Sequence, residues 1–151
     1  AYEIASCLVG SEMCIRDRYL LHLSSFSNLF NGTISLLEGL KLNYQLNVIT
    51  NGFEVVQHNK IKNSGLANYF KNIITAEKVG YKKPNPIIFE YALDQTKTTP
   101  ENSLMIGDSL EADILGALNI GMQAIHFNSL NEPLHDHCPI VNNLYEIKGM
   151  L

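Results

Sequence analysis

This sequence has few cysteines, no long apolar run and no excess of basic residues, and each of these features excludes a class of protein. Three cysteines in 151 residues cannot form the disulfide framework of a small secreted domain, which favours a reduced, cytoplasmic protein. No apolar run approaches the roughly 20 residues that span a bilayer. A net charge of -4 argues against nucleic-acid binding, because a phosphate backbone requires a basic face. A small anionic substrate stays compatible with that charge.

The first eighteen residues lack the pattern of a folded segment. They show no sustained helical or alternating apolar period, and they do not match a signal peptide, since charged residues interrupt the apolar part. Residues 6–18 resemble a translated sequencing-adapter artefact; a native, irregular segment is the alternative. Cys7 and Cys14 are not a zinc motif, because no second ligand pair follows. We therefore expect residues 1–18 to be non-native and residues 19–151 to form one domain.

From Tyr19 onward, short apolar runs alternate with helical patterns. The runs of strand length are 46–50, 72–75, 103–107 and 123–127, and the helical stretches between them are 54–64, 86–96 and 110–119. A further helix precedes them, with Thr33 as its cap, and a last short strand and helix fall within 141–147. Apolar strands separated by helices predict a parallel sheet covered on both sides, an α/β doubly wound fold.

Three polar signals fall in the connections of this sheet, where open parallel sheets bind their ligands. The first is Thr50-Asn51-Gly52, which ends one strand and precedes a helix. A hydroxyl and free amides beside a helix N-terminus form an anion site. The alternative is a plain strand-to-helix turn, for which Asn-Gly is a common dipeptide.

The second signal is a pair of lysines before the helical stretch 86–96. Asn85 as cap and Pro86 in the first turn explain much of this segment structurally. Lys83 on the side of the site would neutralise a phosphate or keep a carboxylate ionised. The alternative is a solvated lysine.

The third signal is Gly107-Asp108-Ser109, followed by Asp113. An aspartate directly after a buried strand suits Mg²⁺, which prefers oxygen ligands and takes one or two protein carboxylates. Capping of the next helix by Asp108 or Ser109 is the alternative. Asp113 lies about one turn into that helix, where it would hold the loop or a metal-bound water, and Glu111 is expected to face solvent.

Together, in this order, the three signals resemble the haloacid dehalogenase superfamily. Its second motif matches Thr50, its third Lys83 and its fourth Asp108 and Asp113, over a stretch from about Leu29 to Leu151. A closer resemblance to nucleotidases of the YjjG type, which dephosphorylate nucleoside monophosphates, rests on segments 50–53, 65–66, 69–70 and 79–86.

The resemblance implies a Mg²⁺-dependent phosphatase that hydrolyses a small phosphomonoester through an aspartyl-phosphate. In it, Asp108 holds the metal, Thr50 and Asn51 hold phosphate oxygens, Lys83 stabilises the transferring group, and Asp113 supports the site. The family's first motif, Asp-x-Asp-x-Thr, which carries the nucleophile, does not occur in this sequence. We therefore expect the chain to be an inactive part of its parent protein, without the first strand and most of the helical cap.

Three alternatives stay open. A dehalogenase of the same superfamily is disfavoured by Gly107-Asp108-Ser109, where such enzymes typically carry Ser-Ser-Asn. A non-catalytic module that binds phosphate or a partner protein is the second. The third is a metal site at residues 135–138, His-Asp-His-Cys, which is disfavoured against a solvated loop because adjacent residues rarely converge on one ion.

Overall fold

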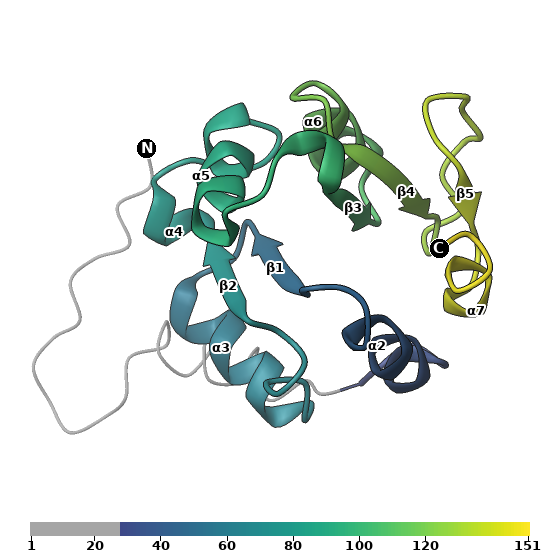
Figure 1. Cartoon of the computed structure of the whole chain (residues 1–151), viewed down its shortest axis with the longest axis horizontal. Coiled ribbons are helices and arrows are strands. Elements are labelled where there is room, and N and C mark those ends of the chain that lie inside the picture. The colour runs from purple at the N-terminus through teal and green to yellow at the C-terminus, as the bar shows by residue number, and fades with distance from the viewer. Residues whose placement is uncertain (1–27) are drawn as a thin grey trace, which may run out of the picture.

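The chain forms two small parallel sheets, as Figure 1 shows. The computed structural model describes residues 28–151. In the first sheet β1 (Asn47–Thr50) pairs with β2 (Asn72–Thr75), and Thr50 lies opposite Thr75. In the second, β3 (Leu104–Gly107) pairs with β4 (Gln123–Phe127), and β4 pairs with β5 (Ile140–Val141). This arrangement confirms the α/β class with parallel strands.

Helices connect the strands and cover them. They are α2 (Thr33–Lys41), α3 (Glu54–Asn63), α4 (Ala76–Val79), α5 (Pro86–Thr96), the 3-10 turn η1 (Pro100–Asn102), the π-helical segment η2 (Leu110–Leu115), α6 (Gly116–Leu118) and α7 (Leu144–Ile147). Strands β1, β2, β3 and β5 are each followed by a helical segment, and the first and third polar signals lie in the loops directly after β1 and β3.

Two apolar clusters hold these elements together. One joins both sheets: its buried residues include Ile74 from β2, Phe89 from α5 and Met105 from β3. The other packs α2 and α7 against the second sheet through residues such as Leu40 and Ile125. Along β3, Met105 belongs to the first cluster while Leu104 and Ile106 contact the second. Both faces of β3 are therefore apolar, as the continuous run in the sequence predicted.

Local sequence signals located some elements and missed others. The helix predicted at 86–96 is α5, with Asn85 accepting a hydrogen bond from Ile87 N–H (3.0 Å) and Pro86 in the first turn. The prediction that Thr33 caps the first helix is wrong: its hydroxyl donates to the Phe30 carbonyl (2.8 Å), and Gly32 occupies the cap position. The segment predicted as a helix at 110–119 divides into η2 and α6.

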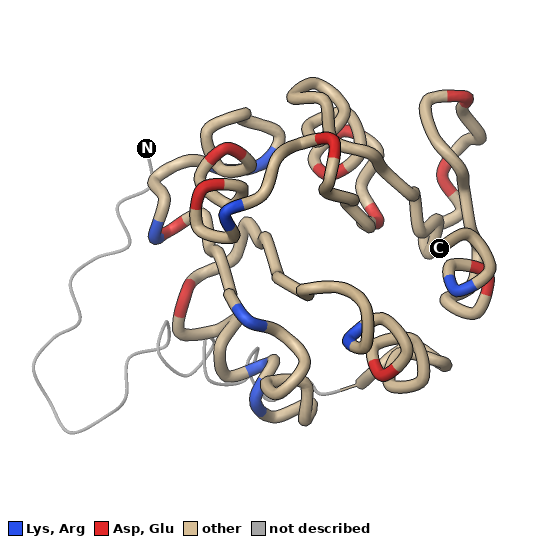
Figure 2. Tube along the Cα trace, in the orientation of Figure 1, with Lys and Arg blue, Asp and Glu red and all other residues tan. Residues whose placement is uncertain are grey.

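The surface charges do not gather by sign along the described chain. Lysines and acidic residues are interspersed from α2 to α7 (Figure 2). Within residues 28–151, no helix is long and apolar enough to cross a membrane. The expectations for residues 1–18 and for Tyr19 lie outside the described part of the chain.

Candidate active site at the ends of the strands

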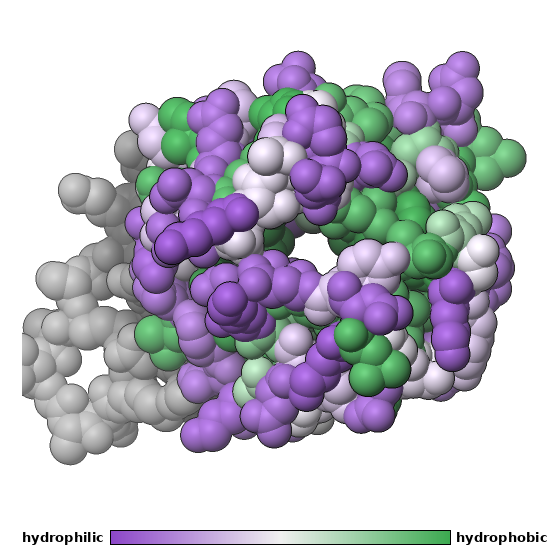
Figure 3. All heavy atoms as spheres, viewed as in Figure 1, coloured by the Kyte–Doolittle hydropathy of each residue, from purple (hydrophilic) through white to green (hydrophobic). Residues whose placement is uncertain are grey.

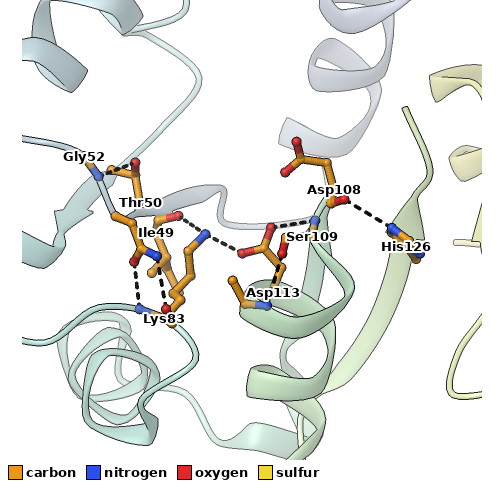
Figure 4. A network of polar contacts seen from close by, with 10 residues as sticks. Ile49, Thr50, Gly52, Lys83, Asp108, Ser109, Asp113 and His126 are labelled. Atoms are coloured by element: carbon orange, nitrogen blue, oxygen red, sulfur yellow. Dashed lines mark hydrogen bonds and ion pairs between the residues drawn. The ribbon is translucent and has the colours of Figure 1, made fainter. Parts of the chain in front are cut away.

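Lys83 lies between the carboxyl end of β1 and the turn of η2 that follows β3 (Figure 4). Its ammonium group donates to the carbonyl of Ile49 in β1 (3.0 Å) and pairs with the carboxylate of Asp113 (2.5 Å). The Asn51 side chain fixes the Lys83 backbone from both sides, accepting from its N–H (2.7 Å) and donating to its carbonyl (3.1 Å). The predicted site residues Asn51, Lys83 and Asp113 thus form one connected network.

The π-helical turn of η2 places the Asp113 carboxylate. Both Asp113 N–H and Ile114 N–H donate to the Ser109 carbonyl (3.0 and 3.2 Å), so the turn holds more residues than an α turn. Asp113 is buried, and its second carboxylate oxygen accepts from Ser109 N–H (3.4 Å). A side chain at Gly107 would collide with that carboxylate, which explains the glycine at the end of β3. Asp113 therefore holds the loop, one of the two roles expected for it.

Asp108 presents a free carboxylate at the end of β3. Ser109, not Asp108, caps η2, since its hydroxyl accepts from Ala112 N–H (3.2 Å). Asp108 is exposed, and its carboxylate makes no hydrogen bond or ion pair with residues 28–151; only its backbone carbonyl is engaged, by His126 (3.2 Å). Hard cations such as Mg²⁺ bind carboxylate oxygens, and the Asp108 carboxylate is free to serve as such a ligand.

The carboxyl end of β1 carries a partly satisfied anion site. Thr50 Oγ accepts from Gly52 N–H (3.2 Å), which leaves the hydroxyl hydrogen to donate to an anion. At the start of α3, however, Glu54 N–H already donates to the carboxylate of Glu77 (2.7 Å). The groups available to bind a phosphate here are therefore the Thr50 hydroxyl and the backbone around Asn51, because the Glu54 N–H at the start of α3 is already hydrogen-bonded.

A buried histidine in β4 supports the Asp108 loop. His126 in β4 is fully buried, and its Nε2 must donate to the Asp108 carbonyl because a carbonyl only accepts. Its Nδ1 then accepts from Nε2 of His135 (2.9 Å). No local pattern in the sequence indicates this contact with Asp108, which lies 18 residues away.

The loop that contains His135 shows no metal site. Within residues 28–151, no three His, Cys, Asp or Glu side chains are grouped so as to hold a metal ion. Nδ1 of His135 is buried without a hydrogen-bond partner. Burial, together with the neighbouring His126 and His137, lowers the pKa of His135 below its usual value. The neutral imidazole therefore fits this position better than the charged one.

Among the predicted site residues, Asp108 has the carboxylate that fits a magnesium ligand. Magnesium usually takes one or two protein carboxylates and completes its shell with water and substrate oxygens. The unpaired carboxylate of Asp108 fits one such protein ligand, and residues 28–151 hold no group of three His, Cys, Asp or Glu side chains that could form a complete metal site. The remaining acidic side chain of the network, Asp113, is already paired with Lys83.

Known proteins are similar to this chain in sequence and in fold. The chain is 42% identical over 129 residues to the glyceraldehyde 3-phosphate phosphatase of Methanothermobacter thermautotrophicus and 41% identical over 125 residues to the pyrimidine 5′-nucleotidase YjjG of Escherichia coli. Each match covers 80% of this chain, and 57% and 55% of the relative. The chain thus spans little more than half the length of these relatives.

A solved structure agrees with this result. The HAD-hydrolase YfnB of Bacillus subtilis, bound to magnesium, superposes with a TM-score of 0.82 at 29% identity, over 88% of this chain and 60% of that one. The family model for haloacid dehalogenase-like hydrolases matches residues 12–127. That range contains every residue of the network around Lys83, together with Asp108 and Thr50. The chain belongs to the haloacid dehalogenase-like hydrolase family.

Proposed function

We propose that the whole protein is a cytoplasmic, Mg²⁺-dependent phosphatase whose substrate is a small phosphomonoester, a nucleoside monophosphate in the first place. This chain supplies the part of the site that binds phosphate and metal, and a preceding segment supplies the nucleophile. The proposal rests most directly on Lys83, a cation held by the ends of both sheets between Thr50 and the Asp108 loop.

The chemistry follows from these positions. An aspartate from outside this sequence attacks phosphorus in line, the ester P–O bond breaks, and water later hydrolyses the aspartyl-phosphate. Lys83 stabilises the negative charge of the transferring group, and Thr50 with the Asn51 backbone holds its oxygens. Asp113 keeps the Lys83 ammonium in place. Asp108 holds magnesium, which when bound offsets the repulsion between nucleophile and phosphate.

The names of the two relatives give two substrates to distinguish. One relative is a phosphatase for glyceraldehyde 3-phosphate and the other a pyrimidine nucleotidase, at nearly equal identity. The choice of a nucleotide rests on the closer resemblance to YjjG-type nucleotidases that the segments 50–53, 65–66, 69–70 and 79–86 carry. Comparison of uridine monophosphate with glyceraldehyde 3-phosphate at equal concentration tests it directly.

A chimera tests the proposed reaction. The part of E. coli YjjG that precedes its matched region is fused to residues 28–151, and phosphate release is measured with and without Mg²⁺. We expect Mg²⁺-dependent turnover that falls by at least about 100-fold in Lys83→Met and in Asp108→Asn. Lys82→Met and Glu111→Gln, exposed neighbours of these residues, are the matched controls. Unchanged turnover in Lys83→Met would refute the central role of that lysine.

The chain by itself is expected to release no phosphate. It holds no Asp-x-Asp-x-Thr motif, and loss of the nucleophile typically removes several orders of magnitude of rate. A non-catalytic role in phosphate binding is the competing function, and the chimera separates the two: a module that only binds would gain no turnover from an added nucleophile.

A further inference from the structure

The peptide group between Asp108 and Ser109 is held at both of its polar atoms (Figure 4). Its carbonyl, on Asp108, accepts a hydrogen bond from Nε2 of His126 (3.2 Å), and its N–H, on Ser109, donates to the Asp113 carboxylate (3.4 Å). The Asp108 side chain itself makes no hydrogen bond or ion pair with residues 28–151. The direction of its carboxylate therefore depends on the backbone that carries it, and two contacts fix that backbone.

His126 is a polar ring on an apolar strand. It lies in β4 between Ile125 and Phe127 and is fully buried, and Figure 3 shows mainly hydrophobic residues around the part of the molecule that contains β4. Burial of a polar ring is costly unless its nitrogens are hydrogen-bonded, and both nitrogens of His126 have a partner. A rotation of the ring about its bond to Cβ would break both contacts, so Nε2 stays directed at the Asp108 carbonyl.

His135 supplies the second of these partners from the loop after β4. Its Nε2 lies 2.9 Å from Nδ1 of His126, and the planes of the two rings differ by 16°. The buried side chain of Asn128 closes the first turn of this loop, because it accepts from Glu132 N–H (2.7 Å) and donates to the Glu132 carbonyl (2.9 Å). The loop therefore has internal contacts of its own that place His135 beside His126.

The chain of two histidines is not the most stable way to fill this space. Nδ1 of His135 is buried without a hydrogen-bond partner, which costs free energy. A buried polar network with an unpaired member is less favourable than an apolar core of the same volume. Stability alone therefore does not explain the two rings. At its other end the chain reaches the carbonyl of Asp108, the residue that fits a magnesium ligand.

We propose that His126 and His135 are positioning residues of the metal site. His126 fixes the Asp108 backbone so that the carboxylate keeps one direction, and His135 holds the His126 ring in the orientation that this hydrogen bond needs. Replacement of residues that orient a metal ligand typically changes metal affinity about 10–100-fold. Their role rests on the proposed function, in which Asp108 binds magnesium, and it makes metal binding depend on the loop after β4.

Manganese binding to the full chain tests this role without any catalysis. Mn²⁺ prefers the same oxygen ligands as Mg²⁺, and it broadens the NMR signals of nearby amides. Broadening of the Gly107 and Ser109 amide signals during a titration therefore measures binding at Asp108, even when the affinity is low. Asp108→Asn is titrated in the same way and is expected to lose the broadening at this loop.

Two variants of His126 separate its two contacts. Glutamine places an amide N–H where Nε2 of the imidazole lies, so His126→Gln keeps a donor for the Asp108 carbonyl. Asparagine reaches only as far as Nδ1, so His126→Asn keeps an acceptor for His135 and loses that donor. We expect the Mn²⁺ affinity to fall about threefold in His126→Gln and about tenfold or more in His126→Asn.

A second pair of variants tests His135. His135→Gln keeps an amide donor for Nδ1 of His126, whereas His135→Leu removes it. We expect the first to bind Mn²⁺ like the unaltered chain and the second to bind about threefold more weakly. His137→Gln, at an exposed histidine on the same loop, is the matched control. The amide spectrum of each variant verifies that it stays folded.

One measurement needs no substitution. With ¹⁵N in histidine and ¹³C in the aspartate carbonyls, a hydrogen bond from His126 to Asp108 gives a scalar coupling between Nε2 and the carbonyl carbon. We expect this coupling in the unaltered chain. Its absence there would overturn the positioning role, whatever the variants do.

The results separate this role from the proposed function. Broadening that is absent in the unaltered chain, or unchanged in Asp108→Asn, would remove Asp108 as the metal ligand, and with it both proposals. Broadening that Asp108→Asn abolishes, while His126→Asn and His135→Leu keep the full affinity, would refute the positioning role alone. Equal losses in His126→Gln and His126→Asn would assign the effect to packing around β4 and would also overturn it.

Discussion

At the scale of single residues, Lys83 connects β1, through Ile49, with η2, through Asp113. The sequence predicted Lys83 as a site residue but did not predict these two contacts. The helix-start signal at Asn85 and Pro86 drew attention to Lys83, and the apolar strand before η2 drew attention to Asp108. In both cases a local sequence pattern predicts where a strand or helix ends and therefore which residues lie in the loop. The ion pair of Lys83 with Asp113 joins residues 30 positions apart, and no local period encodes it. The same holds for His126 and Asp108. Candidate residues were thus predictable, but their pairings depend on tertiary packing.

Removal of Lys83 is expected to destabilise the fold. Both side chains of the Lys83–Asp113 pair are about nine-tenths buried, so Lys83→Met leaves Asp113 as an unpaired buried charge. Such a loss costs roughly 3–5 kcal/mol, whereas the double variant Lys83→Met/Asp113→Leu removes both charges and recovers much of it. Urea unfolding followed by circular dichroism gives the coupling energy. Strictly additive costs would show that the pair does not interact, and Lys82→Met is the surface control.

Gly116 tests how closely α5 approaches α6. A methyl group at Gly116 would lie 2.8 Å from the Phe89 ring and 3.1 Å from the Pro84 backbone. Gly116→Ala should therefore destabilise by about 1–3 kcal/mol, although alanine normally favours a helix. In Gly39→Ala on α2 the new methyl has 3.8 Å to its nearest neighbour, and a gain of about 0.5–1 kcal/mol is expected. Equal effects at both sites, from thermal melts, would contradict the close contact.

At the scale of elements, the capping signals of α5 predicted its bounds correctly, whereas Thr33 did not prove to be the cap of α2. The segment of α5 begins at Pro86 after its Asn85 cap and ends at Thr96, as its sequence indicates. The stretch 110–119 was expected to be one regular helix, because Ile114 and Ala117 fall on a buried face at helical spacing. A wide π turn keeps that face buried while it redirects Asp113, so the apolar pattern alone does not reveal it.

The loop after β4 should weaken the protein in mild acid. His135 stacks on His126 and its ring lies 5.4 Å from that of His137, with Asp136 and Glu132 opposing part of their charge. Because the folded pKa of His135 lies below its ordinary value near 6.5, the unfolded chain binds the proton first. The free energy of unfolding is therefore unaffected above that pH and falls as the pH drops below it. Unfolding by urea at a series of pH values measures the slope.

A matched pair of histidine variants isolates this effect. His135→Gln removes the titrating group while an amide can still donate to His126, so the slope between pH 6.5 and the lower folded pKa should flatten. His58→Gln, at an exposed histidine on α3, is the matched control. A slope unchanged in His135→Gln would assign the acid sensitivity to another group.

At the scale of the whole molecule, one apolar cluster makes the two sheets depend on each other. It contains Ile74 of β2 and Met105 of β3, with Phe89 of α5 fully buried between them. The parallel α/β class followed from the alternation of apolar runs and helical patterns. The separation into two sheets did not, since the strand order of a sheet depends on contacts between distant segments.

Phe89→Ala should reduce the stability of both sheets together. The cavity left by a fully buried phenylalanine costs roughly 3–5 kcal/mol. Because Phe89 packs in a cluster shared by the sheets, unfolding curves from far-ultraviolet circular dichroism and from tyrosine fluorescence should shift equally and coincide. Phe53→Ala, at a half-exposed position, should shift them little. Two separated transitions would show that the sheets unfold independently.

The wide turn of η2 also limits how this stretch of the gene can change. Each residue added to or removed from a helical turn rotates all later residues of the helix by about 100°. Deletion of one codon between Ser109 and Asp113 would produce a more regular helix, but it would direct the Asp113 carboxylate away from Lys83. Glu111, exposed on the same turn, can be exchanged freely. Evolution can therefore accept substitutions at the solvent-facing positions of this segment. Insertions and deletions in it would be selected against.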